Sequence, residues 1–523
     1  MTVMRRSLRF RSSVILLLVL ICAPLGTATA GYAAPVGIVA TGTTIAADSG
    51  PVPRFEAAAC PWKLPTGQVE GQTVKCGFAV VPEVHQNPTG PTIRLPVAVF
   101  KSTASTSAPD ATIYLQGGPG AAVGDFITSF LEGHLDRYTA ARDLIVFDQR
   151  GIGFAQPSLD CPEVTAVDLA NVATQTSQTQ KTNDDIAGAF ACRDRLVKQG
   201  IDLGAYTSAE GAADVNDIRA VLGYPQLNLL GVSYGTRLAL TIMRDFPNAV
   251  RSAVLDSSVP LQTNIIEDNG VNFKRSFDLF FAACAADSVC TTKYPALQAD
   301  YAATVAQLNA QPIMTTATDQ KTNETVPVVV DGIELTSLIS VLLYLNSDIT
   351  RIIPPLVEEV KTGQTTILNV ILNAIGPIVG ADINVGAYFS VVCSEEVPFN
   401  NRDRAAAAAQ SLPPDLQEIF ASDVRQHFDI CAQWPVHAIN PVEAQSVTSD
   451  LPALVLSSDN DPATPPSYGT QVEQTLSHGF LITFPGIGHS VLGNGGDCGL
   501  STIFTFIDSP TTKPPTDCVG KTG

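Results

Sequence analysis

Residues 231–235 read Gly-Val-Ser-Tyr-Gly and place a serine between two glycines, directly after the apolar run 227–232. A helix is predicted to start at once and to cover residues 234–246. The glycines leave room for a sharp strand-to-helix turn that holds the serine hydroxyl exposed. The N-terminus of the helix also favours negative charge that develops beside this hydroxyl. The pattern predicts Ser233 as a nucleophile; the alternative is a tight turn without chemistry.

A serine hydroxyl becomes a good nucleophile only when a positioned base removes its proton. At a turn of this kind the partners follow in the chain order serine, acid, histidine. His489 lies in a glycine-rich loop directly after the last apolar strand, residues 480–486, whereas His478 lies at a predicted helix end, where the helix dipole stabilises a cation. We therefore predict His489 as the base and a structural role for His478.

The acid is expected after the predicted strand 451–459, where the sequence SSDNDPATP offers Asp459 and Asp461. Asp461 begins a turn before a proline, and from there a carboxylate can point toward a histidine. Asp459 can instead close the end of the strand. We predict Asp461 as the acid that holds the imidazole tautomer and stabilises the imidazolium.

A Gly-Gly-Pro-Gly loop, residues 117–120, follows the predicted strand 112–116. A loop in this position can donate one backbone N–H to an oxyanion, and Tyr234, directly after the nucleophile, donates the other. We predict Gly118 as the donor from the loop. Taken alone, the same glycines are typical of an ordinary loop.

Short β-branched runs alternate with helical stretches from about residue 74 to residue 260, which is typical of a mostly parallel sheet covered by helices on both faces. Thr207 and Glu210 resemble a capping box that opens a helix running to about Leu222. The predicted strands are 74–82, 92–100, 112–116, 144–149, 227–233, 252–258, 451–459 and 480–486.

Residues 262–445 are mainly helical, with one short β-like piece, ETVPVVVDG. An insertion of this length predicts a cap over the carboxyl edge of the sheet, where such folds bind ligands. The sheet domain then consists of residues 56–261 and 446–523.

The first thirty residues predict a signal peptide, because four arginines precede the apolar run 14–26 and small residues follow it. The run is shorter than the ~20 residues of a spanning helix, so a membrane anchor is the less favoured alternative. Residues 31–55 are expected to be a flexible leader. Removing residues 1–30, which hold four arginines and no acidic residue, changes the formal net charge from −19 to −23. This acidity argues against a nucleic-acid partner, and no stable membrane insertion is expected after cleavage.

Ten of the eleven cysteines remain after cleavage, and an even number in an exported chain favours disulfides over a metal site. No CxxC pair or HExxH helix is present, so a zinc site or other metal site is not expected. Ten cysteines permit many connectivities. Pairing of sequence neighbours is a guess that gives Cys60–Cys76, Cys161–Cys192, Cys284–Cys290, Cys393–Cys431 and Cys498–Cys518.

Five motifs in this order resemble one family: LQGGPG (115–120), DQRGIG (148–153), GVSYGT (231–236), DPATP (461–465) and GIGHS (486–490). They are similar to the secreted tripeptidyl aminopeptidases and proline iminopeptidases of the α/β-hydrolase family. The resemblance spans residues 75–500 and implies an α/β-hydrolase fold with a large, mainly helical cap. It implies a cofactor-free serine exopeptidase, with Ser233, Asp461 and His489 as its triad and Gly118 and Tyr234 as its oxyanion donors.

Two departures favour the tripeptidyl branch of this family. Proline iminopeptidases usually have histidine where this chain has Gln116, and serine where it has Phe154-Ala155. Asp148 and Arg150 of the DQRG motif are expected to form an internal ion pair that braces the loop.

Substrate selection is expected to lie in the cap. Residues 388–396 resemble the segment whose acidic residue in relatives holds the ammonium group of the substrate, and they end in Glu395 and Glu396. An exopeptidase must measure distance from a charged amine, and a buried or half-buried carboxylate does so. The alternative is a solvated pair of glutamates.

Together these features predict a secreted or periplasmic serine aminopeptidase that releases tripeptides or single residues from peptides with a free N-terminus. A carboxylesterase acting on small esters is the alternative with the same chemistry. A non-catalytic binding module is the alternative from another class.

Overall fold

The computed structural model describes residues 51–318, 324–345, 350–375 and 383–521. The predicted signal peptide, residues 1–30, and most of the predicted leader, residues 31–55, lie outside the described residues. The end of the leader is ordered, because residues 54–57 pair with the next strand.

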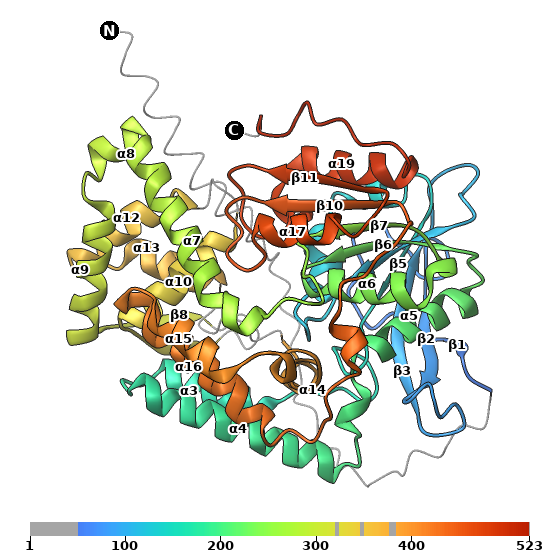
Figure 1. Ribbon diagram of the computed structural model, residues 1–523, viewed down its shortest axis with the longest axis horizontal. Coiled ribbons are helices and arrows are strands. Elements are labelled where there is room, and N and C mark those ends of the chain that lie inside the picture. The colour runs from blue at the N-terminus through green and yellow to red at the C-terminus, as the bar shows by residue number, and fades with distance from the viewer. Residues whose placement is uncertain (1–50, 319–323, 346–349, 376–382, 522–523) are drawn as a thin grey trace, which may run out of the picture.

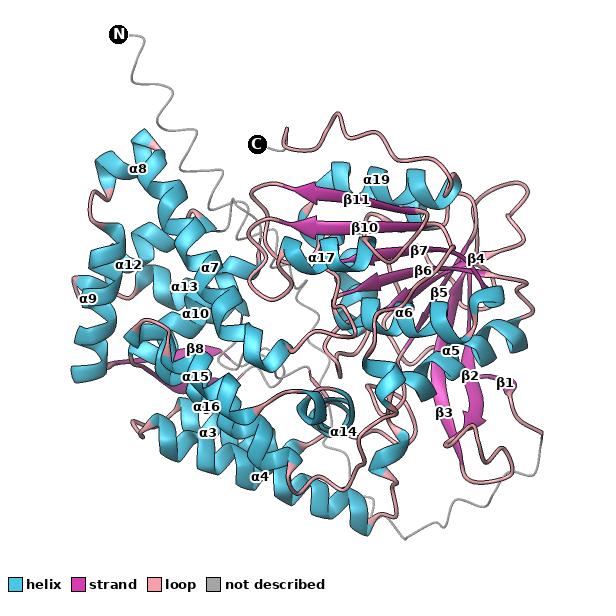
Figure 2. Ribbon diagram, viewed as in Figure 1, coloured by secondary structure: helices cyan, strands magenta, loops and turns pink. Residues whose placement is uncertain are grey.

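A nine-stranded sheet runs through the part of the chain described here, in the order β1-β2-β3-β5-β4-β6-β7-β10-β11. The pairs from β5 to β11 are parallel, and β1, β2 and β3 are joined to them by antiparallel pairing. Figure 2 shows that the sheet is twisted, with β10 and β11 horizontal at the top and β2 and β3 running steeply at the lower right. Their bounds are β1 Arg54–Ala57, β2 Val74–Pro82, β3 Thr92–Phe100, β4 Ala111–Leu115, β5 Asp143–Phe147, β6 Leu227–Val232, β7 Val250–Asp256, β10 Ala453–Ser458 and β11 Gly479–Phe484.

The central strands β4, β5 and β6 are buried along their whole length. Strands covered on both faces read as continuous apolar runs, and this is the pattern that the sequence showed. The predicted mostly parallel sheet is therefore confirmed, and β2 and β3 have the predicted bounds.

Helices cover both faces of the sheet. Val215, Ile242 and Val472 come from α5, α6 and α17 and pack on one face, whereas Tyr138 and Ile503 come from α2 and α19 and pack on the other. The bounds of these helices and of the short α18 are α2 Leu135–Tyr138, α5 Ser208–Leu222, α6 Tyr234–Asp245, α17 Pro466–Glu473, α18 Val491–Asn494 and α19 Gly496–Asp508.

A separate, mainly helical body lies beside the sheet, at the left in Figure 1. Its own hydrophobic core joins α7, α9, α10, α12, α13 and α16 to the β8–β9 hairpin. The elements from the insertion are α7 Ile265–Ala286, α8 Ser288–Lys293, α9 Leu297–Ala310, β8 Ile313–Thr318, β9 Thr325–Val330, α10 Gly332–Tyr344, α12 Ile353–Lys361, α13 Thr366–Ile375, α14 Val385–Glu395, α15 Arg402–Gln410 and α16 Pro414–Cys431.

Two helices from the first half of the chain lie with this body. α3 (Pro162–Val172) and α4 (Gln178–Lys198) run beneath α14 and α16 in Figure 1, and Leu196 of α4 shares a core with Phe389 and Trp434. The sequence analysis placed both helices in the sheet domain. We propose that the cap is built from this pair and from residues 262–445.

Five disulfides connect the predicted cysteine couples, Cys60–Cys76, Cys161–Cys192, Cys284–Cys290, Cys393–Cys431 and Cys498–Cys518. The predicted connectivity is confirmed. Disulfides of this number persist in oxidising compartments. Within the described ranges, none of the helices has the length and apolar character needed to cross a bilayer.

Candidate active site

Ser233 occupies the turn between β6 and α6 with φ 56° and ψ −124°. A Cβ atom on Gly235 would lie 1.9 Å from the carbonyl oxygen of Leu115, and one on Gly231 would lie 2.5 Å from the carbonyl oxygen of Gly235. No side chain fits at either position, because both obstacles are backbone. The turn therefore needs both glycines, and strained backbone of this kind concentrates at functional sites.

His489 and Asp461 lie side by side after β11 and β10. The Nδ1 atom of His489 is 2.8 Å from Oδ2 of Asp461. The other carboxylate oxygen of Asp461 accepts the amides of Ala463 and Thr464 at 2.9 and 2.8 Å, and the Thr464 hydroxyl donates to Oδ2 at 2.6 Å. These bonds fix the carboxylate, which is fully buried.

The two groups shift each other's pKa. Burial opposes ionisation of Asp461, but the charge of His489 and the hydrogen bonds from His489 and Thr464 outweigh it and lower the pKa of this carboxyl. Burial likewise disfavours the imidazolium of His489, yet the charge and hydrogen bond of Asp461 raise its pKa above 6.5. The pair is suited to accept a proton on the imidazole.

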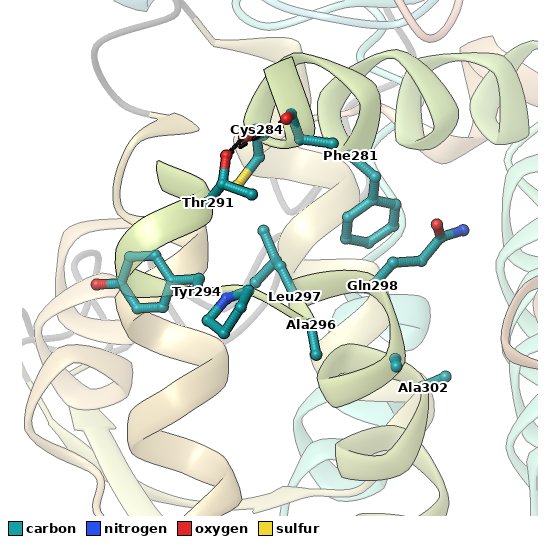
Figure 3. A pocket seen from close by; sticks show the side chains of 11 residues that line it. Phe281, Cys284, Thr291, Tyr294, Ala296, Leu297, Gln298 and Ala302 are labelled. Atoms are coloured by element: carbon teal, nitrogen blue, oxygen red, sulfur yellow. Dashed lines mark hydrogen bonds between the residues drawn. The ribbon is translucent and has the colours of Figure 1, made fainter. Parts of the chain in front are cut away.

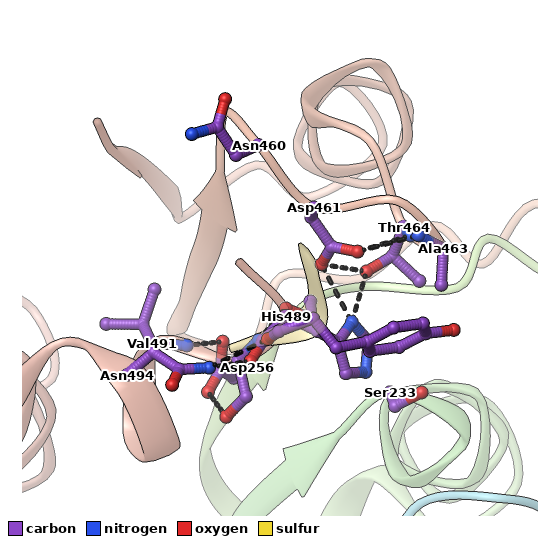
Figure 4. A network of polar contacts seen from close by, with 12 residues as sticks. Ser233, Asp256, Asn460, Asp461, Ala463, Thr464, His489, Val491 and Asn494 are labelled. Carbon is purple, nitrogen blue, oxygen red and sulfur yellow. Dashed lines mark hydrogen bonds and ion pairs between the residues drawn. The ribbon is translucent and has the colours of Figure 1, made fainter. Parts of the chain in front are cut away.

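Figure 4 shows Ser233 and Asp461 on opposite sides of the His489 imidazole. The structure thus brings together the three residues that the sequence analysis selected, although 228 and 28 positions separate Ser233 and His489 from Asp461 along the chain. Asp459 lies apart from this group, because its carboxylate accepts the amide of Gly486 at 2.7 Å. His478 is also apart, with Nδ1 2.9 Å from the carbonyl oxygen of Asp450.

The two segments that carry the predicted oxyanion donors both lie next to the serine. Tyr234 is the first residue of α6, where amides have no partner within the helix. A Cβ atom on Gly117 would lie 3.1 Å from Cβ of Ser233, so the loop after β4 touches the nucleophile turn. Gly118 follows with φ 117°, which favours glycine. The loop predicted to stabilise an oxyanion therefore lies at Ser233.

Glu395 and Glu396 end α14 and are buried rather than solvated, with exposed fractions of 2% and 8%. Glu395 accepts hydrogen bonds from the amide and the hydroxyl of Ser208, and its Oε2 is 3.1 Å from Nε of Arg237. Glu396 has its Oε1 2.9 Å from Nη1 of Arg237. The solvated alternative is wrong. Both oxygens of Glu395 are already occupied, so Glu396 is the less engaged carboxylate of the two.

Burial is also the main reason that the pKa of Glu396 is raised to about 7. Arg237 opposes the rise and Glu395 adds to it. This carboxyl is thus poised to ionise near neutral pH. The same network reaches the nucleophile turn, because Ser208 Oγ lies 2.8 Å from the hydroxyl of Tyr234.

The expected ion pair between Asp148 and Arg150 is wrong. Arg150 makes two hydrogen bonds to the carboxylate of Asp214, at 2.8 and 2.7 Å. Asp148 instead accepts the amides of Val123 and Phe154, both at 2.9 Å. Both side chains are still fixed by hydrogen bonds, Asp148 to amides 25 and 6 residues away and Arg150 to a carboxylate 64 residues away.

A surface pocket of about 500 Å³ lies at the far end of the cap (Figure 3). It is lined by residues of α7, α8 and α9, among them Phe281, Thr291 and Leu297. These helices lie at the outer end of the cap in Figure 1, away from the sheet and from the strand ends that carry Ser233 and His489. The pocket is therefore not part of the candidate active site.

Three contributors to this site were not singled out by the sequence analysis. Arg237 lies four residues after the nucleophile, and Asp256 ends β7 at the carboxyl edge of the sheet, so a search for polar residues in buried elements could have found both. Tyr344 of the cap stacks edge-on against the His489 ring with centroids 5.2 Å apart. Its sequence context, an apolar helix, gives no such signal.

Comparison with known proteins shows what this chain is similar to. Residues 113–325 match the α/β-hydrolase fold family and residues 417–518 match the TAP-like protein family. The chain is 26% identical to serine protease Hip1 of Mycobacterium tuberculosis over 86% of this chain and 87% of that one. It is 34% identical to the tripeptidyl aminopeptidase of Streptomyces coelicolor over 39% and 38% of the two chains. It is 26% identical to carboxylesterase B of M. tuberculosis over 86% of each.

Among solved structures, the proline iminopeptidase of Mycobacterium smegmatis is 14% identical with a TM-score of 0.36, over 83% of this chain and 98% of that one. The fold and the matched regions define an α/β hydrolase. The chain is thus an enzyme of the serine-hydrolase type, and its C-terminal part is similar to the TAP-like proteins.

Proposed function

We propose that this enzyme is an exported serine aminopeptidase that cleaves peptides with a free N-terminus through an acyl-enzyme at Ser233. The observation that carries the proposal is the line of Ser233, His489 and Asp461 at one edge of the sheet (Figure 4). Serine peptidase names among relatives that cover most of the chain support it.

The reaction follows from the roles of the three side chains. His489 takes the proton of the Ser233 hydroxyl as its oxygen attacks the scissile carbonyl, and the carbonyl π-bond electrons move to oxygen. The amides of Gly118 and Tyr234 stabilise this oxyanion. When the intermediate collapses, His489 gives its proton to the leaving amine. Water then attacks the carbonyl of the acyl-enzyme while His489 takes a proton from it. The bond between the acyl carbon and the Ser233 oxygen breaks, His489 returns the proton to that oxygen, and the acyl group leaves as the carboxylic acid.

We further propose that Glu396 meets the substrate ammonium. It is buried and held by Arg237, which fixes its position, while Glu395 is tied to Ser208 and Arg237 and supports it. An ammonium entering beside Glu396 would gain a charge-assisted hydrogen bond in a site shielded from water. The distance between Glu396 and Ser233 would then set the number of residues released.

Release of tripeptides rests on the partial match to tripeptidyl aminopeptidase from Streptomyces. Export rests on the arginine-flanked apolar run in residues 1–30 and on the five disulfides. Mass determination of the mature N-terminus in culture supernatant tests export; a full-length, cell-bound chain would contradict it.

A carboxylesterase is the second candidate, favoured by the equally long match to carboxylesterase B. One experiment separates the two. Unblocked peptides of two to six residues are compared with their N-acetylated forms and with p-nitrophenyl esters. A peptidase of the proposed kind cleaves the unblocked peptides and loses activity on the acetylated ones; activity on esters alone refutes it.

A further inference from the structure

One carboxylate behind the active site touches both the nucleophile turn and the histidine loop. Asp256 is the last residue of β7 and is fully buried. Its main-chain carbonyl accepts the amide of Ser233 at 2.9 Å. Its side chain points to the segment directly after His489 (Figure 4).

The side chain of Asp256 accepts three hydrogen bonds from this segment. Oδ1 accepts the amide of Val491 at 2.8 Å, and Oδ2 accepts the amide of Leu492 at 2.7 Å and the hydroxyl of Ser490 at 2.9 Å. The amide of Ser490 in turn donates to the hydroxyl of Ser257 at 2.9 Å. The start of α18 is thus bound to the end of β7 by four contacts.

Backbone strain is concentrated in the same place. Among the described residues other than glycine, Ser233, Ser257 and Ser490 have a positive φ, of 56°, 56° and 73°. Conformations of this kind are strained and persist only where surrounding contacts hold them. The bonds to Asp256 are those contacts for Ser233 and Ser490.

We propose that Asp256 is a positioning residue that sets Ser233 and His489 relative to each other and supports the imidazolium by its charge. No hydrogen bond joins it to the imidazole, so it acts through the two backbones and through space. The titratable groups that face His489 are Asp461 after β10, Asp256 on β7 and Tyr344 of the cap. After Asp461, the charge of Asp256 is the other contribution that raises the pKa of His489.

The test is the rate of fluorophosphonate labelling as a function of pH, because this reaction needs Ser233 and His489 but no peptide substrate. In Asp256→Asn one carboxylate oxygen becomes an amide that cannot accept the N–H of the loop. We expect labelling to slow by roughly 10- to 100-fold, since small misplacements of reacting groups cost about this much. We also expect the acidic limb of the profile to move to lower pH, because a negative charge near His489 is lost.

Ser490→Ala is the matched control, because it leaves the charge of Asp256 in place and removes one of the three bonds, together with the bond that Ser490 Oγ accepts from the amide of Gly493. Its labelling should slow less, and its acidic limb should stay at the wild-type pH. The proposal would be overturned by a folded Asp256→Asn protein whose labelling rate and acidic limb are both the same as in the wild type. If labelling of Asp256→Asn is slower but the acidic limb of its pH profile stays at the wild-type pH, the claim that the charge of Asp256 supports the imidazolium is overturned, and Asp256 has a purely structural role.

If Asp256→Asn does not fold, Ser490→Ala and Ser257→Ala decide the question. Each should slow labelling about 3-fold or more, and wild-type rates in both would overturn the proposal. This inference rests on the proposed function, but different results would refute the function and the role of Asp256. Wild-type protein that is folded but unlabelled refutes the function, whereas labelled wild type with identical variants refutes only the role of Asp256.

Discussion

Replacing the carboxylate of Asp461 by an amide should nearly abolish turnover. In Asp461→Asn the contact to Nδ1 of His489, 2.8 Å in the structure, loses its charge, and the amide NH2 group can favour the wrong imidazole tautomer. Two unit charges at this distance attract by about 6 kcal/mol at an effective dielectric constant of about 20. A triad carboxylate is typically worth about four orders of magnitude in rate, which is about 5.5 kcal/mol. The two figures agree.

The assay is kcat for release of the N-terminal fragment from an unblocked peptide, with fluorophosphonate labelling as a second readout. Asp459→Asn is a matched control, because it removes a carboxylate two residues away that bonds Gly486 and does not touch His489. We expect about 10⁴-fold loss of kcat in Asp461→Asn and nearly wild-type kcat in Asp459→Asn. Retention of more than about a tenth of kcat by folded Asp461→Asn, or equal losses in both variants, would refute the assigned acid.

Four further outcomes follow from other parts of the structure. Glu396→Gln should raise KM for unblocked peptides by about 10- to 100-fold and leave an N-acylated ester unaffected; equal effects on both substrates would discard the ammonium site. In the wild type, KM for unblocked peptides should fall as pH rises through about 7, where Glu396 ionises, and rise again near about 8, where the substrate amine loses its charge. His85 faces Asp217 and Glu210, which outweigh burial and raise its pKa to about 9. Because the pKa of His85 is higher in the folded than in the unfolded protein, its contribution to the free energy of unfolding is full below about pH 6.5 and is lost as the pH rises through about 9, by up to about 3 kcal/mol. In His85→Gln, the free energy of unfolding from urea denaturation should change less over this pH range. An unchanged pH dependence would contradict the ion pairs. Gly235→Ala should cost more than about 4 kcal/mol, because its Cβ would meet the Leu115 carbonyl oxygen; a variant with the wild-type melting temperature would show that the turn can relax.

Much of the sheet could be predicted from the sequence because each strand carries its own signal. The run 74–82 and the run 92–100 are β-branched and apolar, and both became strands with those bounds. Thr207 accepts the amide of Glu210 as an N-cap should. The guess that neighbouring cysteines pair was right for all five disulfides, although the sequence alone permitted many connectivities.

The partners of buried charges could not be predicted, since they come from distant parts of the chain. Arg150 pairs with Asp214, 64 residues away, rather than with its neighbour Asp148. Glu395 is held by Ser208, 187 residues away, which no local pattern reveals. The placement of α3 and α4 beside the helices of residues 262–445 was missed as well, because a local sequence does not show which surface a helix meets.

The central claim is that Ser233 is activated by His489 and forms a covalent acyl-enzyme. Mass spectrometry of tryptic peptides after fluorophosphonate treatment tests it most directly. We expect one adduct, on the peptide that contains Ser233, which is absent in Ser233→Ala and forms far more slowly in His489→Ala. A folded wild-type protein that carries no adduct, or carries it on another serine, would contradict the account.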